Sequence, residues 1–467
     1  MVQMRGKVDE LKNFECYDKV ELGDKRLSAR LVKMLKQLSS DPTASILAAC
    51  KDIYQAKAVY RFTDNDNVTA DAITKITHDV TINNIKAANP SIVLIPQDTT
   101  EINYCNLEAT EGLGTIARRR ASKGILAHSA IATDEMGNIF GLVAQKLWVR
   151  PPEEHSKAKQ RNKLAIEDKE SNKWLETIEN ASKSFPSGIT AVHICDREGD
   201  IFELFCKAEA EKTNYLCRRW QNRKTADDVH GVLDSFIDAL PVAGEITVHI
   251  PRCSHSKRKA RDAELKIKYG RCQITKPSQL IDTKGLPSAI SVYVVSAVEA
   301  NSPEGQEGVS WQLITNVPTN SFGEAVTRIL WYTQRWKIET FHRTLKSGCK
   351  VEELRSDTAE KLQKLISIYS IIALEIMHLR YLGRMRPDDS CEISFEEDEW
   401  KVLYRVANRT RDLPDEVPTM QEAVMYIAKL GGFPGRKSDG QPGVTVIWRG
   451  LSKLNILMEA LPFFGIL

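Results

Sequence analysis

Four side chains that can contact a phosphate or a metal ion recur at helical spacing between residues 323 and 350 of this 467-residue chain. They are a phenol, a guanidinium, a carboxylate and an ammonium, carried by Tyr332, Arg335, Glu339 and Lys346. At about 100° per residue these positions fall within a stripe roughly 60° wide, so one face of a helix would present all four. A charged stripe of this kind also fits an ordinary solvated helix face.

The segment that carries this stripe has the sequence signals of one long helix. It contains no proline, it has Glu324 in its expected first turn, and it ends at Ser347 and Gly348, directly after Lys346. We therefore expect a single helix from Gly323 to Lys350, with the four functional side chains along one side of it.

Two aspartates follow short apolar segments that are typical of buried strands. Asp98 comes soon after residues 92–95, Ile-Val-Leu-Ile, and Asp196 directly follows residues 191–195. Ligand sites of open α/β sheets lie beyond the carboxyl ends of the strands, so we expect both side chains in one crevice. Taken singly, either aspartate also fits a turn or a helix cap.

Three carboxylates from separate segments, Asp98, Asp196 and Glu339, form the kind of oxygen-rich set that binds divalent metal ions. Mg²⁺ prefers oxygen ligands and keeps several of its waters. A pair of such ions stabilises both the attacking and the leaving oxygen of an in-line phosphoryl displacement. The sequence therefore predicts a phosphoryl-transfer site with two Mg²⁺ ions, for which Mn²⁺ is an expected substitute.

The helix residues and the surroundings of the aspartates resemble the DDE transposases of the IS4 group, and within it the Tn5 type. The signature Tyr-x2-Arg-x3-Glu-x6-Lys of that group stands without a gap at residues 332–346. Asp98 is followed by two threonines and Asp196 by Arg197 and Glu198, as in the group. Further matches follow in order along nearly the whole chain, which is far more specific than a lone motif.

The resemblance implies an α/β fold with an RNase H-like catalytic core, and strands alternate with helices from about residue 73. We expect this core at residues 73–385. An antiparallel β-sheet is expected as an insertion at about 240–320, where four segments alternate apolar and polar residues. A helical DNA-binding domain is expected at residues 1–72 and a helical dimerisation domain at 386–467. The basic N-terminal helices also fit plain solvated helices.

The resemblance also implies roles for individual residues that contact DNA. Tyr332, Arg335 and Lys346 would hold phosphates near the transposon end, and Arg218 would contact DNA close to the cleaved end. Trp311 would stack on a base that is flipped out of the end. Core packing is the alternative for Trp311, and an ordinary charged strand end is the alternative for Arg218.

Basic residues concentrate in two further segments, although the net charge is only +3. Between residues 250 and 276 there are nine lysines and arginines against two acids. Such a concentration suits a protein that holds a polyanion along a groove. A glycine-containing loop carries a second basic run. The candidate phosphate contacts in the two segments are Arg118, Arg119, Arg120, Lys257, Arg258 and Lys259. A solvated loop is the alternative for both.

Composition narrows the class of protein. With 42% hydrophobic and 27% charged residues the chain is ordinary for a globular protein, and its ten cysteines have no zinc-site spacing. The longest apolar run, residues 365–379, contains Glu375 and is too short to span a bilayer, so we expect a buried helix there. We therefore expect a cytoplasmic bacterial protein without a membrane partner.

By resemblance the protein would bind double-stranded DNA, both transposon ends and target, as a homodimer on paired ends. The reaction would be a nick, attack of the freed 3′-hydroxyl on the opposite strand to form a hairpin, reopening of the hairpin, and strand transfer. Three alternatives stay open: an RNase H-like nuclease, a noncatalytic DNA-binding regulator and an inactive copy. The nuclease would not need the terminal domains, and a shortened regulator would lack the first helical segment, which is present here.

Overall fold

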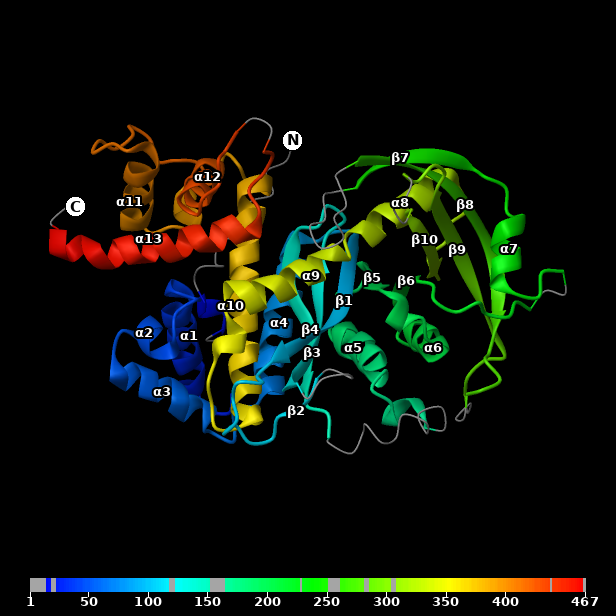
Figure 1. The fold of residues 1–467 in the computed structure, drawn as a ribbon, viewed down its shortest axis with the longest axis horizontal. Coiled ribbons are helices and arrows are strands. Elements are labelled where there is room, and N and C mark those ends of the chain that lie inside the picture. Colours follow the sequence, from blue (N-terminus) through cyan, green and yellow to red (C-terminus); the bar gives the residue numbers. More distant parts are fainter. Residues whose placement is uncertain are drawn as a thin grey trace.

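The computed structural model describes residues 14–17, 22–116, 122–151, 164–226, 229–250, 261–280, 285–303, 308–436 and 439–464. One long helix, α10 (Ala359–Met385), runs through the middle of the molecule. On one side of it lie the N-terminal and C-terminal helices, and on the other side lies a large β-sheet with its own covering helices (Figure 1).

Five strands form the core of the sheet, in the order β4-β3-β1-β5-β6. Strand β1 pairs antiparallel with β3 and parallel with β5, while β3 pairs antiparallel with β4, and β5 pairs parallel with β6. Their bounds are β1 Ile92–Asn103, β3 Lys123–Thr133, β4 Ile139–Trp148, β5 Thr190–Cys195 and β6 Asn214–Arg218. This order and these directions are those of an RNase H-like sheet, so the predicted fold class is confirmed.

The inserted strands continue this sheet and do not form a separate one. Strand β10 (Ser310–Thr315) pairs antiparallel with β6, and β9 (Ala289–Glu299), β8 (Arg261–Thr275) and β7 (Gly244–Ile250) follow in antiparallel order. With the short β2 (Gly114–Thr115) beside β3, the described sheet has ten strands. The alternation of apolar and polar residues predicted the antiparallel strands correctly, because one face of each is buried.

Helices cover opposite faces of the sheet near the end of β5. Cys195 belongs to a buried cluster with α5 (Asn172–Ser182) and α6 (Phe202–Ala210). Its neighbour Ile194 packs in a different cluster, with α8 (Phe322–Thr333). Successive residues of a strand point to opposite faces, so α8 lies on the face away from α5 and α6.

Helix α10 is the apolar helix that the sequence predicts, and it is longer than the expected run. By length and composition it is the one helix of the described chain that could cross a membrane, yet 83% of its most apolar window is buried inside the structure. It contacts α4 (Ala70–Ala88), β4 and the helices of both terminal regions. The prediction of a buried core helix is confirmed.

The N-terminal region is helical, as predicted, with one difference. Helix α1 (Lys25–Ser40) buries the apolar side chains of one face, among them Leu31, Leu35 and Leu38. After α1 the chain forms two short helices in place of one continuous helix, α2 (Ile46–Cys50) and α3 (Ile53–Thr63), because Lys51 has a left-handed backbone with φ of 56°. Asp52 then caps the start of α3 through its side chain.

The C-terminal region consists of α11 (Glu397–Asn408), α12 (Met420–Leu430) and α13 (Val444–Phe464). Helices α12 and α13 approach closely at Gly450, where a Cβ atom would lie within 3 Å of the Ile427 backbone. Helix α13 packs in part inside its own chain, since Trp448 is buried, while Ile456 is 60% exposed.

Candidate active site

Asp98 lies within strand β1 and not after its end. Strand β1 pairs with β5 as far as Pro96, whose partner is Ile194, and then continues to Asn103 beside β3. The strand is longer than the apolar run suggested because its polar second half also pairs with β3. Asp98 therefore lies two residues beyond the last pair with β5, where one edge of β1 has lost its parallel neighbour.

Asp196 directly follows the last residue of β5 and begins a short 3-10 turn. Its carboxylate accepts a hydrogen bond of 2.8 Å from the backbone N–H of Glu198. Because Pro96 pairs with Ile194, Asp98 and Asp196 each lie two residues beyond the same paired position on neighbouring parallel strands. The two carboxylates are close enough for the charge of Asp196 to raise the pKa of Asp98.

The expected single helix of residues 323–350 is three consecutive segments, so the prediction of an uninterrupted α-helix is wrong. They are α8 (Phe322–Thr333), α9 (Trp336–Arg343) and a π-helical turn (Thr344–Gly348). Between α8 and α9 the backbone N–H groups of Gln334 and Arg335 bond to carbonyls three residues back. Such bonds wind the chain more tightly than an α-helix, which changes the direction of the side chains that follow.

Arg335 links two of the three predicted carboxylates. Its Nη2 donates a hydrogen bond of 2.6 Å to Oε1 of Glu339, one helical turn further on, and its Nη1 lies 3.5 Å from Oδ2 of Asp98. The Arg335 side chain is only 12% exposed, and its charge also acts on Asp196. Acids from β1, from the end of β5 and from α9 thus meet around one guanidinium.

Burial is the main cause that shifts the pKa values of both aspartates upward. Burial, and next the charge of Asp196, raise the pKa of Asp98 to about 6; the N–H of Thr99 and the guanidinium of Arg335 oppose the rise. Burial also raises the pKa of Asp196, against the N–H of Glu198. A bound cation favours the charged form of such carboxylates, so the cluster gains from a further positive charge.

The three carboxylates supply the hard oxygen donors that a divalent metal ion requires. Within the described part of the chain, no group of three acidic, histidine or cysteine side chains already stands at metal-binding distances. Arg335 contacts both Asp98 and Glu339 and is the positive charge among the carboxylates. The donor set fits a divalent ion in its chemistry, and Arg335 is the group that such an ion would have to displace.

The other two residues of the predicted stripe contact neighbouring strands. Tyr332 is buried, and its ring packs edge-on against Trp311 with 5.8 Å between the ring centroids. Lys346 Nζ donates a hydrogen bond of 2.8 Å to the backbone carbonyl of Glu101 and lies 3.1 Å from a carboxylate oxygen of Glu352. Of the stripe, Arg335 and Glu339 lie among the carboxylates, and Tyr332 is close enough to Asp196 for that charge to raise the pKa of its hydroxyl.

Trp311 and Arg218 lie on the neighbouring strands β10 and β6. Trp311 is half-buried and packs on Tyr332. Arg218 Nη2 donates a hydrogen bond of 2.9 Å to the backbone carbonyl of Ser310, the residue before Trp311. The charge of Arg218 also acts on the Tyr332 hydroxyl, because it opposes the rise of the Tyr332 pKa. These three side chains form one neighbourhood that continues the carboxylate site towards the inserted strands.

Six predicted DNA contacts lie outside the described residues: Arg118, Arg119, Arg120, Lys257, Arg258 and Lys259. Of the basic segment between residues 250 and 276, the structure describes β8 from Arg261 onward. There Arg261 is paired with the Glu299 carboxylate, and Lys268 Nζ donates a hydrogen bond of 2.9 Å to the backbone carbonyl of Asp238. The described part of this segment thus uses some of its positive charge inside the fold.

A buried polar network that the sequence did not single out lies behind the aspartates. Gln97 points to the face of β1 opposite Asp98. It lies 3.2 Å from His128 Nε2 on β3 and 3.4 Å from His193 Nδ1 on β5, and Thr99 Oγ1 lies 2.9 Å from the other nitrogen of His128. The network ties together the strands that carry the aspartates. Its signal in the sequence is three polar residues inside otherwise apolar strands.

Three family models match separate segments of this chain. A transposase DNA-binding model matches residues 15–68, a transposase DDE domain model matches residues 207–375, and a model of the Tn5 transposase dimerisation domain matches residues 371–464. The DDE match contains Glu339 and begins after both Asp98 and Asp196.

The DDE domain match, on a chain with an RNase H-like sheet, defines the chain as a DDE transposase, an enzyme that transfers phosphoryl groups of DNA. Enzymes of this class use divalent metal ions. The DNA-binding match and the Tn5 dimerisation match complete the assignment: the chain belongs to the Tn5-type DDE transposases.

One solved structure similar to this chain is the cryo-EM structure of the piggyBac transposase synaptic complex with hairpin DNA. The alignment covers 92% of this chain and 79% of that chain, with 10% sequence identity and a TM-score of 0.36.

Proposed function

We propose that this transposase cuts a mobile element out of duplex DNA and joins it to a target, with Asp98, Asp196 and Glu339 as its catalytic carboxylates. The observation that carries the proposal is the convergence of these acids, from three distant segments, around Arg335. The burial that raises the pKa of Asp98 and of Asp196 is costly to the fold, and clustered carboxylates with raised pKa values are typical of functional sites.

Two Mg²⁺ ions, or Mn²⁺ in their place, would be held by Asp98, Asp196 and Glu339. Bound there, they would activate a water or a 3′-hydroxyl for attack and stabilise the leaving oxygen. The contribution of the chain is position. Asp98 stands on a paired strand, Asp196 directly follows another, and Glu339 stands on a packed helix, so all three are held by rigid elements.

Arg335 would serve first as an internal counterion and then as a phosphate ligand. In the free protein its guanidinium balances Asp98 and Glu339. When the carboxylates take another cation, the guanidinium can turn to a DNA phosphate, which it matches with two parallel hydrogen bonds. Lys346 and Tyr332 would add contacts to phosphates near the same end, and Lys346 would exchange the Glu101 carbonyl for a phosphate oxygen.

The reaction would proceed by a nick, hairpin formation, hairpin opening and strand transfer. Trp311 would hold a base that is flipped out of the transposon end, and Arg218 would contact the backbone beside it. The half-buried indole beside Tyr332 supports this role, since a stacking platform must be both fixed and accessible.

The terminal domains would bring two transposon ends together. The DNA-binding domain would recognise the end, and the dimerisation domain would join two subunits as a homodimer on paired ends. Arg118, Arg119, Arg120, Lys257, Arg258 and Lys259 would add phosphate contacts along end or target DNA. The matches at residues 15–68 and 371–464 support this arrangement. A protein of this function would work on the bacterial nucleoid in the cytoplasm.

Isosteric replacement of the carboxylates tests the proposal. We expect Asp98→Asn, Asp196→Asn and Glu339→Gln to abolish cleavage of a labelled duplex that carries the inverted repeat flanking the gene, with Mg²⁺ present, while binding of that duplex persists. Glu245→Gln is the matched control, because Glu245 is an exposed acid on β7. Cleavage that persists in any one of the three variants would remove that residue from the site.

A further inference from the structure

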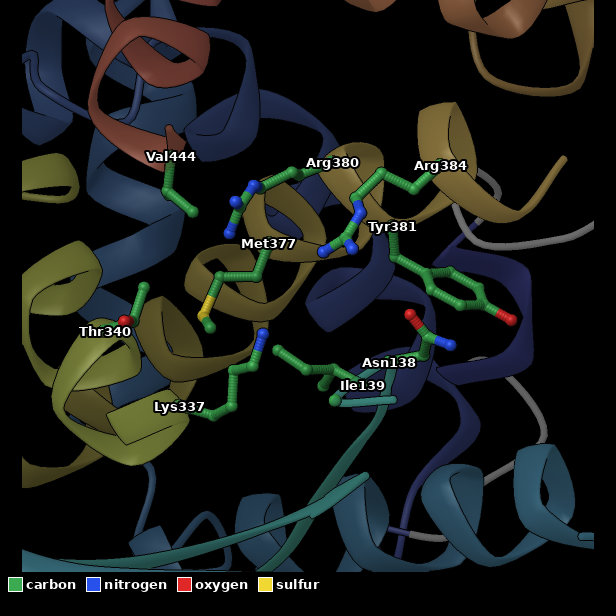
Figure 2. Close-up of a pocket in the computed structure, with 10 residues that line it drawn as sticks. Asn138, Ile139, Lys337, Thr340, Met377, Arg380, Tyr381, Arg384 and Val444 are labelled. Atoms are coloured by element: carbon green, nitrogen blue, oxygen red, sulfur yellow. The ribbon is translucent and has the colours of Figure 1, made fainter. Parts of the chain in front are cut away.

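A hollow lined by positive charge lies behind the proposed catalytic helix (Figure 2). It is formed where α9, α10, the turn between β3 and β4, and the first residue of α13 meet, and it is a small cavity of about 30 Å³ that opens to solvent. Lys337 comes from α9, and Arg380 and Arg384 come from α10. In Figure 2 the charged ends of all three extend into the same space.

This hollow is separate from the carboxylate site. Lys337 stands two positions before Glu339, so the two side chains leave the helix in directions about 160° apart. The turn between β3 and β4 closes the hollow over Lys337. A Cβ atom at Gly137 would lie 2.5 Å from Lys337 Cε, so the glycine, with φ of 80°, allows the turn to pack directly on the lysine.

The positive charges in the hollow are not balanced. No acidic side chain is among the described residues that line it, and no described carboxylate forms an ion pair with Lys337, Arg380 or Arg384. Burial, with the charges of Arg384 and Arg343, lowers the pKa of Arg380. Lys337 and Arg380 are partly buried and Arg384 is exposed, and such crowding of like charges is unfavourable unless an anion binds among them.

One acid outside the lining of the hollow acts on Lys337, and its carboxylate already accepts hydrogen bonds within its own turn. Asp134, in the turn between β3 and β4, is close enough to act on Lys337. Its carboxylate accepts hydrogen bonds of 2.8 and 2.6 Å from the backbone and side chain of Asn138. The carboxylate therefore holds the turn, and three cations face the hollow against this one acid.

Helix α13 adds a further preference for an anion. It begins at Val444, which is buried and lines the hollow, so the positive end of this 21-residue helix lies in the wall. Arg380 Nε also donates a hydrogen bond of 3.0 Å to the backbone carbonyl of Pro442, just before the helix. The hollow thus joins the helix that carries Glu339 to the dimerisation domain.

We propose that this hollow, the Lys337 pocket, binds a phosphate group of the DNA backbone. The inference rests on the function proposed above, which makes DNA the polyanion that the protein must hold. Lys337, Arg384 and the free end of the Arg380 guanidinium provide donors, and the start of α13 provides a favourable potential. A phosphate bound there would fix α9 against the dimerisation domain, so that binding of DNA would set the position of the helix that carries Glu339.

The salt dependence of DNA binding tests the Lys337 pocket without any catalysis. We would measure the affinity of the full-length, metal-free protein for a short duplex of mixed sequence across a range of salt concentrations. Loss of one phosphate contact lowers the slope of log K against log salt by about 0.9. We expect this loss in a variant with Lys337→Gln and Arg384→Gln together, and recovery of the slope in Lys337→Arg. Arg449→Gln, an exposed arginine of α13 that does not line the hollow, should leave the slope unchanged.

The outcomes separate this inference from the proposed function. If the wild-type protein shows no salt-dependent binding, the proposed function fails with it. If the wild type binds and the double variant has the same slope, only the Lys337 pocket is overturned. In a second arm, inorganic phosphate that stabilises the wild type but not the variant against heat, with equal slopes, would assign the pocket to a free anion. A changed dimer content of the variant at equal slopes would assign it to a partner carboxylate, which also overturns the proposal.

Discussion

The charged side chains on the two sides of helix α9 are balanced differently. On one side Arg335 stands among the carboxylates, so the negative charge is partly neutralised inside the chain. On the other side Lys337 faces Arg380 and Arg384, and no acidic residue lines the hollow in the described part of the chain. Burial is the largest cause of the shift on both sides: it raises the pKa of Asp98 to about 6 and lowers that of Lys337 to about 8.

This difference in charge between the two sides of α9 indicates which ligand each side would bind. The acidic side carries its own cation, which a metal ion and a DNA phosphate would replace together. The basic side carries no matching anion and depends on one from outside. Both arrangements reduce the stability of the free protein in favour of ligand binding, as is common at functional sites.

Removal of the internal cation is the strongest test of this comparison. Arg335→Met would leave the largely buried Asp98 and the partly exposed Glu339 without a counterion. Breaking a buried ion pair typically costs about 3 to 5 kcal/mol of unfolding free energy, and solvent screening at Glu339 places the expected loss at about 3 kcal/mol or less. We expect this loss in chemical denaturation of the metal-free protein, and a partial recovery on addition of Mg²⁺. An unchanged midpoint in the metal-free variant would mean that Arg335 does not balance these acids.

Replacement of one acid should have the opposite effect on the stability of the fold. The pKa of Asp98 is raised to about 6 from 3.8, so its protonated form is favoured in the fold. Its contribution to stability is therefore fully present below about pH 4 and is lost as the pH rises through 6. At pH 7 the loss amounts to about 3 kcal/mol at most.

Asp98→Asn should accordingly stabilise the metal-free protein at pH 7 and flatten the fall between pH 4 and 6. Thermal melting across this pH range, beside the Glu245→Gln control, measures both effects. A variant that melts at the same temperature as the wild type at pH 7 would contradict the repulsive character of the cluster.

Replacement of Trp311 tests whether the carboxylate site extends along the sheet as far as β10. If Trp311 stacks on a flipped base, Trp311→Ala should leave melting and the first nick nearly intact and lower hairpin formation. Stacking is worth about 1 to 3 kcal/mol per base, which corresponds to about one to two orders of magnitude in rate. Nick and hairpin yields on a labelled end, measured beside thermal melting, check this.

The alternative for Trp311 predicts a different pattern. Truncation of a core tryptophan costs about 3 to 5 kcal/mol of stability and would depress every step together. A large drop in melting temperature, with nick and hairpin yields falling in parallel, would show that Trp311 is a core residue. The acidic site would then extend no further than Tyr332.

The last expected effect lies on the basic side. The pKa of Lys337 is lowered from 10.5 to about 8, so its neutral form is favoured in the fold. Stability should therefore rise as the pH increases from about 8 towards 10.5, the reverse of the trend at Asp98. Lys337→Gln should remove this rise in alkaline thermal melting. A rise that persists in the variant would mean that the Lys337 side chain is not crowded by the two arginines.

The sequence by itself determined the parts that depend on local pattern. The spacing of Tyr332, Arg335, Glu339 and Lys346 on a helical segment, and the two aspartates after apolar runs, are readable without a fold because helix and strand periods are fixed. The alternation that predicted β7 to β10 is local in the same way, and the family matches agree with the resemblance that these motifs carry. The roles of the site residues themselves stay predictions.

The tertiary structure alone decided which segments meet. Strand β1 extends past Asp98 because β3 pairs with its polar half, and β10 joins the core because it pairs with β6. The position of Arg335 among the acids depends on the tightened turn before α9 and on the distance to β1. The Lys337 pocket needs four elements from distant parts of the chain. Contacts of this kind arise from the packing of whole elements, and a pattern read along one segment contains no information about its distant neighbours.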